Sequence, residues 1–274
     1  MRKTVVLLCA LMFLLASSLA AGVISIGSYS GSSRPFLGSN YSNLRAALTD
    51  PANFGPGGVV TDTFSFLPAI STLDAGSLAG TDILFLTEPG PLSASAVTAV
   101  DNFVLGGGKL VLVTDSGGDT GIGAILTALD GGSIAGSGGT NGPGGTFVGS
   151  GLATNGPFGT VTGPVGLSLN ANLVPGSHTT AILTVGGTTA YAEIAPGALQ
   201  AGSGAVAILG DVSWMNYFIG PGATLTDTGN NRLMALNFLA GPGGTATPEP
   251  STTLLLGAGL LGLAGCISRG RRSC

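Results

Sequence analysis

The sequence predicts an α/β domain with a mostly parallel sheet and helices on both faces, flanked by an N-terminal signal helix and a C-terminal membrane helix. Three observations favour this fold class. Short, almost continuous apolar runs are typical of strands buried on both faces. Amphipathic segments alternate with these runs through short connections, which indicates βαβ units. The two longest apolar segments lie at the ends of the chain, outside residues 21–246.

The first half of the domain begins with the run VISIGS, which predicts a buried strand at Val23–Ser28. A short helix follows at 43–48 and ends before the Asp50-Pro51 turn. The alternating segment Val59–Phe66 predicts a second strand, and the apolar run Asp82–Leu86 predicts a third.

A βαβ unit continues from there. Ser93 is placed to cap a helix that extends through Leu105 and stops at the glycines Gly106–Gly108. The run KLVLVT then predicts a buried strand at Lys109–Thr114, and a short helix is expected at Ile122–Leu129.

The second half of the domain is less regular. Residues 131–160 are dominated by Gly, Ser, Thr, Asn and Pro, so we expect a long surface excursion. The pattern then predicts a hairpin about Gly186-Gly187, a core strand and a final helix. Their expected bounds are Thr179–Val185 and Thr189–Ile194 for the hairpin, Ala205–Gly210 for the strand and Asn231–Leu239 for the helix.

Residues 1–20 have the three parts of a secretory signal peptide. Arg2 and Lys3 precede the apolar run Val5–Leu15, and Ser18-Leu19-Ala20 supplies the small residues that signal peptidase requires. The apolar run is shorter than the roughly 20 residues of a membrane-spanning helix. The mature chain is therefore expected to begin near residue 21, outside the cytoplasm.

The last 28 residues, 247–274, contain a second apolar run. Residues 252–267 are rich in leucine and glycine and are marginally long enough to span a bilayer. Three arginines follow directly and are expected to keep the C-terminus cytoplasmic. The alternative is a buried core helix, which would carry polar positions at helical spacing.

These features together resemble a PEP-CTERM sorting signal, in which a Pro-Glu-Pro triplet precedes a short span and an arginine cluster. The matching residues are Pro248, Glu249, Pro250, Arg269, Arg271 and Arg272. The resemblance implies export, recognition by an exosortase, a transient stay in the inner membrane as a single-pass precursor, and delivery to the cell envelope or extracellular matrix. It also implies an association with biofilm and exopolysaccharide. The terminal Cys274 departs from the pattern.

The composition of the body excludes several functions. Between residues 21 and 246 there are only four basic residues against 12 acidic ones, so binding to a nucleic acid is disfavoured. All three cysteines lie in the terminal segments. The body therefore has no disulfide, no thiolate metal site and no cysteine nucleophile, and with one histidine a zinc site is not expected.

Two stretches of the body resemble the non-catalytic branch of the class I glutamine amidotransferase-like proteins, which have a flavodoxin-type fold. They are DILFLTEPGPLSASAVTAVDNFVLGGGKLVLVTDSG and AVAILGDVSWMNYF, the latter followed by TGNNRLMALNFLAG. The resemblance implies a strand that ends in Asp after a Gly-Gly turn, and a later strand that ends in Gly-Asp.

Ligands in open parallel sheets bind at the carboxyl ends of the strands. The residues expected there are Glu88, Asp115, Ser116, Asp119, Asp211 and Trp214. One interpretation is a polar pocket for a sugar or for Ca²⁺, with Trp214 stacking on the ligand. The other is that the acids only cap helices and loops while Trp214 plugs the end of the sheet.

The catalytic residues of an amidotransferase are not present. The expected nucleophile position reads Thr114-Asp115-Ser116, and the single histidine, His178, follows a Pro-Gly turn in an expected loop. We therefore expect a non-enzymatic, exported surface or extracellular-matrix protein without metal or cofactor, which is either a structural component or binds carbohydrate. The alternative is an extracellular hydrolase that uses Ser116 or the acids at the strand ends.

Overall fold

A computed structural model describes the following residues: 21–115, 117, 119–137, 142–143, 145–167, 171–211 and 230–242. The predicted signal peptide at 1–20, the predicted span at 252–267 and the sorting residues lie outside this range. Among the described residues no helix has the length and apolar character needed to cross a membrane.

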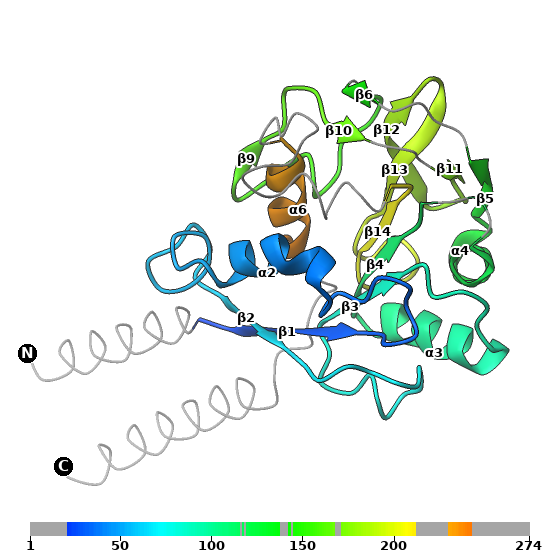
Figure 1. Ribbon diagram of the computed structural model, residues 1–274, viewed down its shortest axis with the longest axis horizontal. Helices are drawn as coiled ribbons and strands as arrows, with labels where there is room; N and C mark the ends of the chain where they lie inside the picture. The colour runs from blue at the N-terminus through cyan, green and yellow to red at the C-terminus, as the bar shows by residue number, and fades with distance from the viewer. Residues whose placement is uncertain are drawn as a thin grey trace, which may run out of the picture.

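The centre of the fold is a five-stranded parallel sheet (Figure 1). Its strand order is β2-β1-β3-β4-β14, which is the flavodoxin-type order. The bounds are β1 (Val23–Ser28), β2 (Thr63–Phe66), β3 (Ile83–Thr87), β4 (Lys109–Val113) and β14 (Val206–Leu209). The predicted parallel α/β sheet is thereby confirmed.

An antiparallel extension continues the same sheet beyond β14. It starts with the predicted hairpin, whose turn residues Gly186 and Gly187 have φ of 56° and 83°, values that suit a two-residue hairpin turn. The strands of the extension are β5 (Ser133–Ser137), β7 (Thr146–Phe147), β11 (Ala171–Val174), β12 (Thr179–Val185) and β13 (Thr188–Ile194). Two small ladders lie apart, β6 (Gly142–Pro143) with β10 (Gly166–Leu167) and β8 (Asn155–Gly156) with β9 (Gly159–Thr160).

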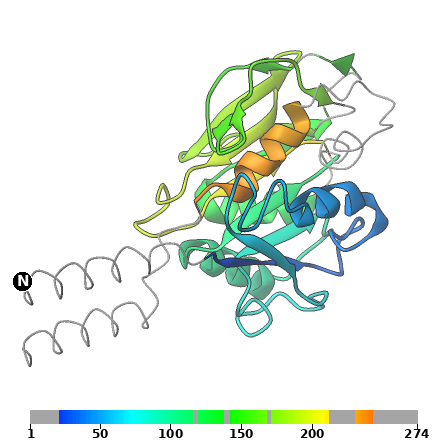
Figure 2. The same ribbon diagram turned by 90° about the vertical axis from the view of Figure 1, so that its left-hand side faces the viewer.

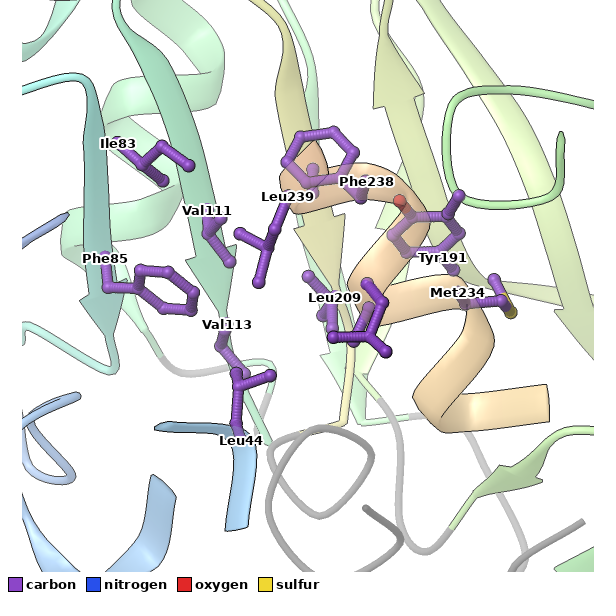
Figure 3. Close-up of a cluster of buried hydrophobic side chains, with 14 of the residues drawn as sticks. Leu44, Ile83, Phe85, Val111, Val113, Tyr191, Leu209, Met234, Phe238 and Leu239 are labelled. Atoms are coloured by element: carbon purple, nitrogen blue, oxygen red, sulfur yellow. The ribbon is translucent and has the colours of Figure 1, made fainter. Parts of the chain in front are cut away.

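Helices cover both faces of the sheet, as predicted (Figure 2). The helices are η2 (Ser39–Tyr41), α2 (Ser42–Thr49), α3 (Ala94–Leu105), α4 (Thr120–Asp130) and α6 (Asn230–Ala240). Alternate residues of each strand serve opposite faces. Ile83 and Phe85 pack in the core that α2 and α6 share, whereas Leu84 and Leu86 pack in the core of α3 and α4. Figure 3 shows the first of these cores, with Phe238 and Leu239 of α6 lying against the strands.

Two expectations need correction. The strand expected at Val59–Phe66 is shorter, because its partner β1 begins at Val23, which pairs with Thr63. Residues 59–62 lie outside β2, and in this stretch Val60 forms an isolated bridge with Phe54. Residues 131–160 are also more than a surface excursion, because β5 joins the main sheet and Ala153 is fully buried in the core.

Two asparagines of α6 hold the glycine-rich segment in place. The Asn237 side chain accepts a hydrogen bond from the Phe158 N–H (2.9 Å) and donates to the carbonyls of Ala153 (3.2 Å) and Gly159 (2.8 Å). Asn231 exchanges two hydrogen bonds with the backbone of Gly166. Both side chains are buried. They pair backbone groups that a glycine-rich loop would otherwise bury without partners.

Candidate functional site

The candidate site lies where the loops after β1 and β3 diverge. Because β2 and β3 flank β1 on opposite sides, the chain turns in opposite directions after β1 and after β3. In open α/β sheets, ligands bind at the carboxyl ends of the strands beside such a point. We call this edge of the sheet the strand-end edge. It receives the loop after β1, which contains Ser32, Ser33 and Arg34, and the residue after β3, Glu88.

Arg34 brings two of the predicted acids together. Its Nη1 atom lies 3.6 Å from Glu88 Oε2 and 3.4 Å from Asp115 Oδ2. Ser33 Oγ donates a 2.6 Å hydrogen bond to the same Glu88 oxygen. The side chains of all three charged residues stay partly exposed, so solvent reaches the group. Sequence reasoning missed Arg34 and Ser33. The available signal was that Arg34 is one of four cations in the body and follows the first strand.

Glu88 has an unusual backbone. Its φ is +45°, a left-handed conformation that costs a non-glycine residue about 1–2 kcal/mol. Hydrogen bonds on both sides fix it there: the Glu88 N–H donates to Val113 O (2.9 Å), and the Glu88 carbonyl accepts from the Ser33 N–H (3.2 Å). Such conformations concentrate at functional sites, where the surrounding structure compensates for their cost.

Asp119 confirms the capping interpretation for one of the acids. It is the N-cap of α4, and its Oδ1 accepts hydrogen bonds from the N–H groups of Gly121 (3.0 Å) and Ile122 (3.1 Å). Burial raises the pKa of Asp119, the two hydrogen bonds lower it, and the nearby charge of Glu88 raises it. Its second oxygen, Oδ2, is buried without a hydrogen-bond partner among the described residues, as is Oδ1 of Asp115.

Buried polar side chains lie at the ends of β1 and β3, beside Glu88. Ser32 Oγ accepts a hydrogen bond from the Thr87 N–H (3.2 Å), and the Tyr41 hydroxyl lies 2.8 Å from Thr87 Oγ1. Burial raises the pKa of Tyr41 well above its usual value, so the hydroxyl stays neutral. Ser28 Oγ, at the end of β1, is also buried, and no hydrogen-bond partner for it is found in the described part of the chain.

The remaining predicted residues divide into two groups. Asp211 follows β14, which is parallel to β4, so it lies at the same edge of the sheet and is almost fully buried. Its carboxylate is one strand further along than Asp115. Ser116 and Trp214 lie outside the described residues, and their predicted roles stay predictions.

The single histidine lies far from this site. His178 Nδ1 is 2.9 Å from Ser177 Oγ, and the His178 N–H donates to Asp130 Oδ2 (3.2 Å). Asp130 is the last residue of α4, whereas Asp119 precedes its first. An 11-residue helix therefore separates the histidine from the strand-end acids, by about 16 Å at 1.5 Å per residue.

The charge of the site selects its ligands. The carboxylates of Glu88 and Asp115 contact the Arg34 guanidinium, and the charge of Glu88 also acts on Asp119. Two carboxylates outweigh one guanidinium, so the group stays acidic overall even when Asp119 is protonated. Such a site repels phosphate and other anions. No cluster of three or more metal-ligating side chains occurs in the described part of the chain. The group offers carboxylate acceptors beside guanidinium donors, an arrangement that suits ligands with several hydroxyl groups.

The tail matches a known family model. Residues 246–272 match the PEP-CTERM protein-sorting motif, so this part of the predicted identity is confirmed. The motif supports an exported protein that is sorted to the cell envelope or beyond and recognised by an exosortase. No curated protein matches the chain.

Several solved structures share the fold at low sequence identity. The mmIFT52 N-terminal domain aligns with a TM-score of 0.54 and 13% identity, over 78% of this chain and 93% of its own. A putative ThuA-like protein from Bacteroides uniformis aligns with a TM-score of 0.51 and 10% identity, over 81% of this chain and 92% of its own. A cytoplasmic protein from Salmonella typhimurium aligns with a TM-score of 0.50 and 12% identity, over 82% of this chain and 100% of its own. At these identities the likeness shows the fold alone, and the amidotransferase-like family is not confirmed.

Proposed function

We propose that this chain is an exported, non-enzymatic surface or matrix protein whose α/β body binds carbohydrate at the strand-end edge. The sorting motif at 246–272 supports delivery to the envelope. The observation that carries the binding function is Arg34 held between Glu88 and Asp115 at the divergence of β1 and β3.

In this proposal the tail is a sorting signal that is removed after export. Residues 252–267 hold the precursor in the inner membrane after signal peptidase has removed residues 1–20, and an exosortase then cleaves near Pro248-Glu249-Pro250. The short apolar run and the arginines that follow it support a transient span. Mass spectrometry of the released protein tests this stage. We expect residues 254–274 to be missing, and a mature protein that retains them would overturn it.

Hydrogen-bond chemistry favours a neutral sugar over other ligands. Two neighbouring hydroxyl groups of a sugar can donate to one carboxylate, while the guanidinium donates to a ring or hydroxyl oxygen. Glu88 and Arg34 offer this combination, and backbone hydrogen bonds hold Glu88 in place, which lowers the entropic cost of binding. An exopolysaccharide of the same envelope is the partner we propose.

Calorimetry with the isolated polysaccharide and a panel of defined glycans tests the binding function. Glu88→Gln and Arg34→Met should each weaken binding at least about tenfold, because each removes a charge-assisted hydrogen bond. Asp101→Asn, on the flank of α3, removes one negative charge away from the site and should leave the affinity unchanged. Binding that survives both site variants would overturn the proposal, and so would release of shortened sugar products.

A second candidate is an extracellular hydrolase. The observation that favours it is that burial, and to a smaller extent the charge of Glu88, raise the pKa of Asp119, since a carboxyl that keeps its proton can act as a general acid. Ser116 is the alternative nucleophile from the sequence. Product analysis with wild type, Ser116→Ala, Asp119→Asn and Glu88→Gln distinguishes a hydrolase from a binding protein. Turnover that any of these variants abolishes would establish the enzyme.

A further inference from the structure

Both ends of the folded body leave it at the same edge of the sheet, opposite to the strand-end edge. At the start of β1, the Gly22 N–H donates to Asp62 Oδ1 (2.7 Å) and the Gly22 carbonyl accepts from the Thr63 N–H (2.9 Å). The last helix ends beside Lys109, which is the first residue of β4. Because β1 and β4 run parallel to β3, these two strand starts lie at one edge, which we call the exit edge.

The C-terminal end of α6 is hydrogen-bonded to the central sheet. Lys109 Nζ donates to three carbonyls at the end of α6, those of Phe238 (2.8 Å), Leu239 (3.1 Å) and Gly241 (2.6 Å). Those carbonyls have no partner within the helix. A buried residue of the central sheet therefore holds the last turn of α6, and Pro242, the last described residue, directly follows Gly241.

The connection from this point to the predicted span is short. Nine residues separate Pro242 from Thr252. Fully extended they reach about 30 Å, and as a flexible chain they span about 17 Å on average. A folded domain of this length has a diameter of about 40–45 Å. The connection is thus too short for the body to turn over and bring its opposite edge to the membrane.

The exit edge also suits a lipid surface. Val23 (63% exposed) starts β1, and Val59 (54% exposed) lies in the loop that leads into β2, so both present apolar surface there. Two acids at this edge accept hydrogen bonds from the backbone: Asp62 from the Gly22 N–H and Asp82 from the Ser25 N–H.

We propose that, while the tail is anchored, the body is held with the exit edge against the lipid headgroups and the strand-end edge pointing away from the membrane. The candidate site then faces the medium before the tail is cut. This orientation rests on the membrane stage of the proposed function.

The cysteine-free body allows a direct test with the full-length precursor in nanodiscs, without exosortase. Cys9→Ser together with Cys274→Ser leaves Cys266 as the label inside the predicted span, and a quencher within the bilayer reports its insertion. In separate variants that also carry Cys266→Ser, a donor dye is placed on Val59→Cys at the exit edge or on Ser95→Cys at the strand-end edge. The acceptor is a dye on the lipid headgroups. We expect energy transfer to be several-fold stronger from Val59→Cys.

The outcomes separate the two proposals. If the Cys266 label is not quenched, the membrane stage of the proposed function is wrong. If Cys266 is quenched but transfer from the two edges is equal, or stronger from Ser95→Cys, the orientation is wrong while the anchored tail stands. The pair Thr61→Cys and Ala94→Cys repeats the comparison at neighbouring exposed positions, should either first variant fold poorly.

Discussion

The side-chain amine of Lys109 lies 2.6 Å from the carbonyl oxygen of Gly241, a contact that spans 132 positions of sequence. It links the central strand of the fold to the last residues before the tail. Lys109 is buried, and its amine also lies over the Phe238 ring at 5.3 Å. Burial lowers the pKa of Lys109 to about 7, and the negative charge of Glu193 opposes this shift.

The first prediction concerns pH. The folded pKa of Lys109 lies below its unfolded value of 10.5, so between about pH 7 and pH 10 the unfolded chain binds more protons. The free energy of unfolding should therefore rise with pH over this window. Lys109→Met should flatten the rise. Denaturant titrations at several pH values measure both, and a slope that Lys109→Met leaves unchanged would assign the dependence to another group.

The second prediction concerns the strained backbone of Glu88. Glu88→Gly and Glu88→Ala both remove the side chain and its contacts with Ser33 and Arg34, but only glycine relieves the left-handed conformation. Glu88→Gly should be the more stable of the two by up to about 1 kcal/mol. Chemical denaturation of the matched pair gives the difference. Equal stabilities would mean that the backbone at residue 88 carries no strain.

The third prediction concerns Asp119, which caps α4 through hydrogen bonds and also carries a carboxyl charge that burial disfavours. Asparagine can still accept the hydrogen bonds from Gly121 and Ile122, and it removes a buried charge. Asp119→Asn should therefore leave the free energy of unfolding at pH 7 unchanged or raise it, whereas Asp119→Ala should lower it by about 1 kcal/mol. A large destabilisation by asparagine would show that the negative charge itself is required for the fold.

The fourth prediction concerns the attachment of the glycine-rich segment to α6. Asn237→Ala removes three hydrogen bonds and should lower the free energy of unfolding by about 2–3 kcal/mol. Hydrogen exchange should accelerate in residues 151–160 before it does in β4. Asn102→Ala, at an exposed position of α3, is the matched control and should change stability by less than about 0.5 kcal/mol. Uniform acceleration across the body would contradict the local role of Asn237.

Sequence patterns located the elements of the central sheet because burial on both faces leaves a strong local signal. The runs at Val23–Ser28 and Lys109–Val113 are apolar whichever face they serve, and Ser93 caps α3 as its position indicated. The antiparallel strand β5 escaped prediction, since Gly and Ser residues in Ser133–Ser137 give no periodic pattern. Its place in the sheet comes from pairing with β11, a partner that is distant in sequence.

Only some residues of the candidate site could be predicted from the sequence. The carboxyl ends of parallel strands had to share an edge, so Glu88 and Asp115 could be expected near each other. Nothing local indicates that Arg34 bridges them, because that contact joins positions 81 residues apart. The burial of Asp119 Oδ2, which has no hydrogen-bond partner among the described residues, likewise depends on the packing of the domain.

Local patterns were enough to predict the parallel α/β core and the sorting signal, because apolar periodicity and the terminal motif are properties of short segments. Which side chains share an edge, how Lys109 holds the end of α6, and which edge lies beside the last described residue became visible only in the folded domain. These are contacts between residues far apart in sequence, and they are selected by the packing of the whole domain.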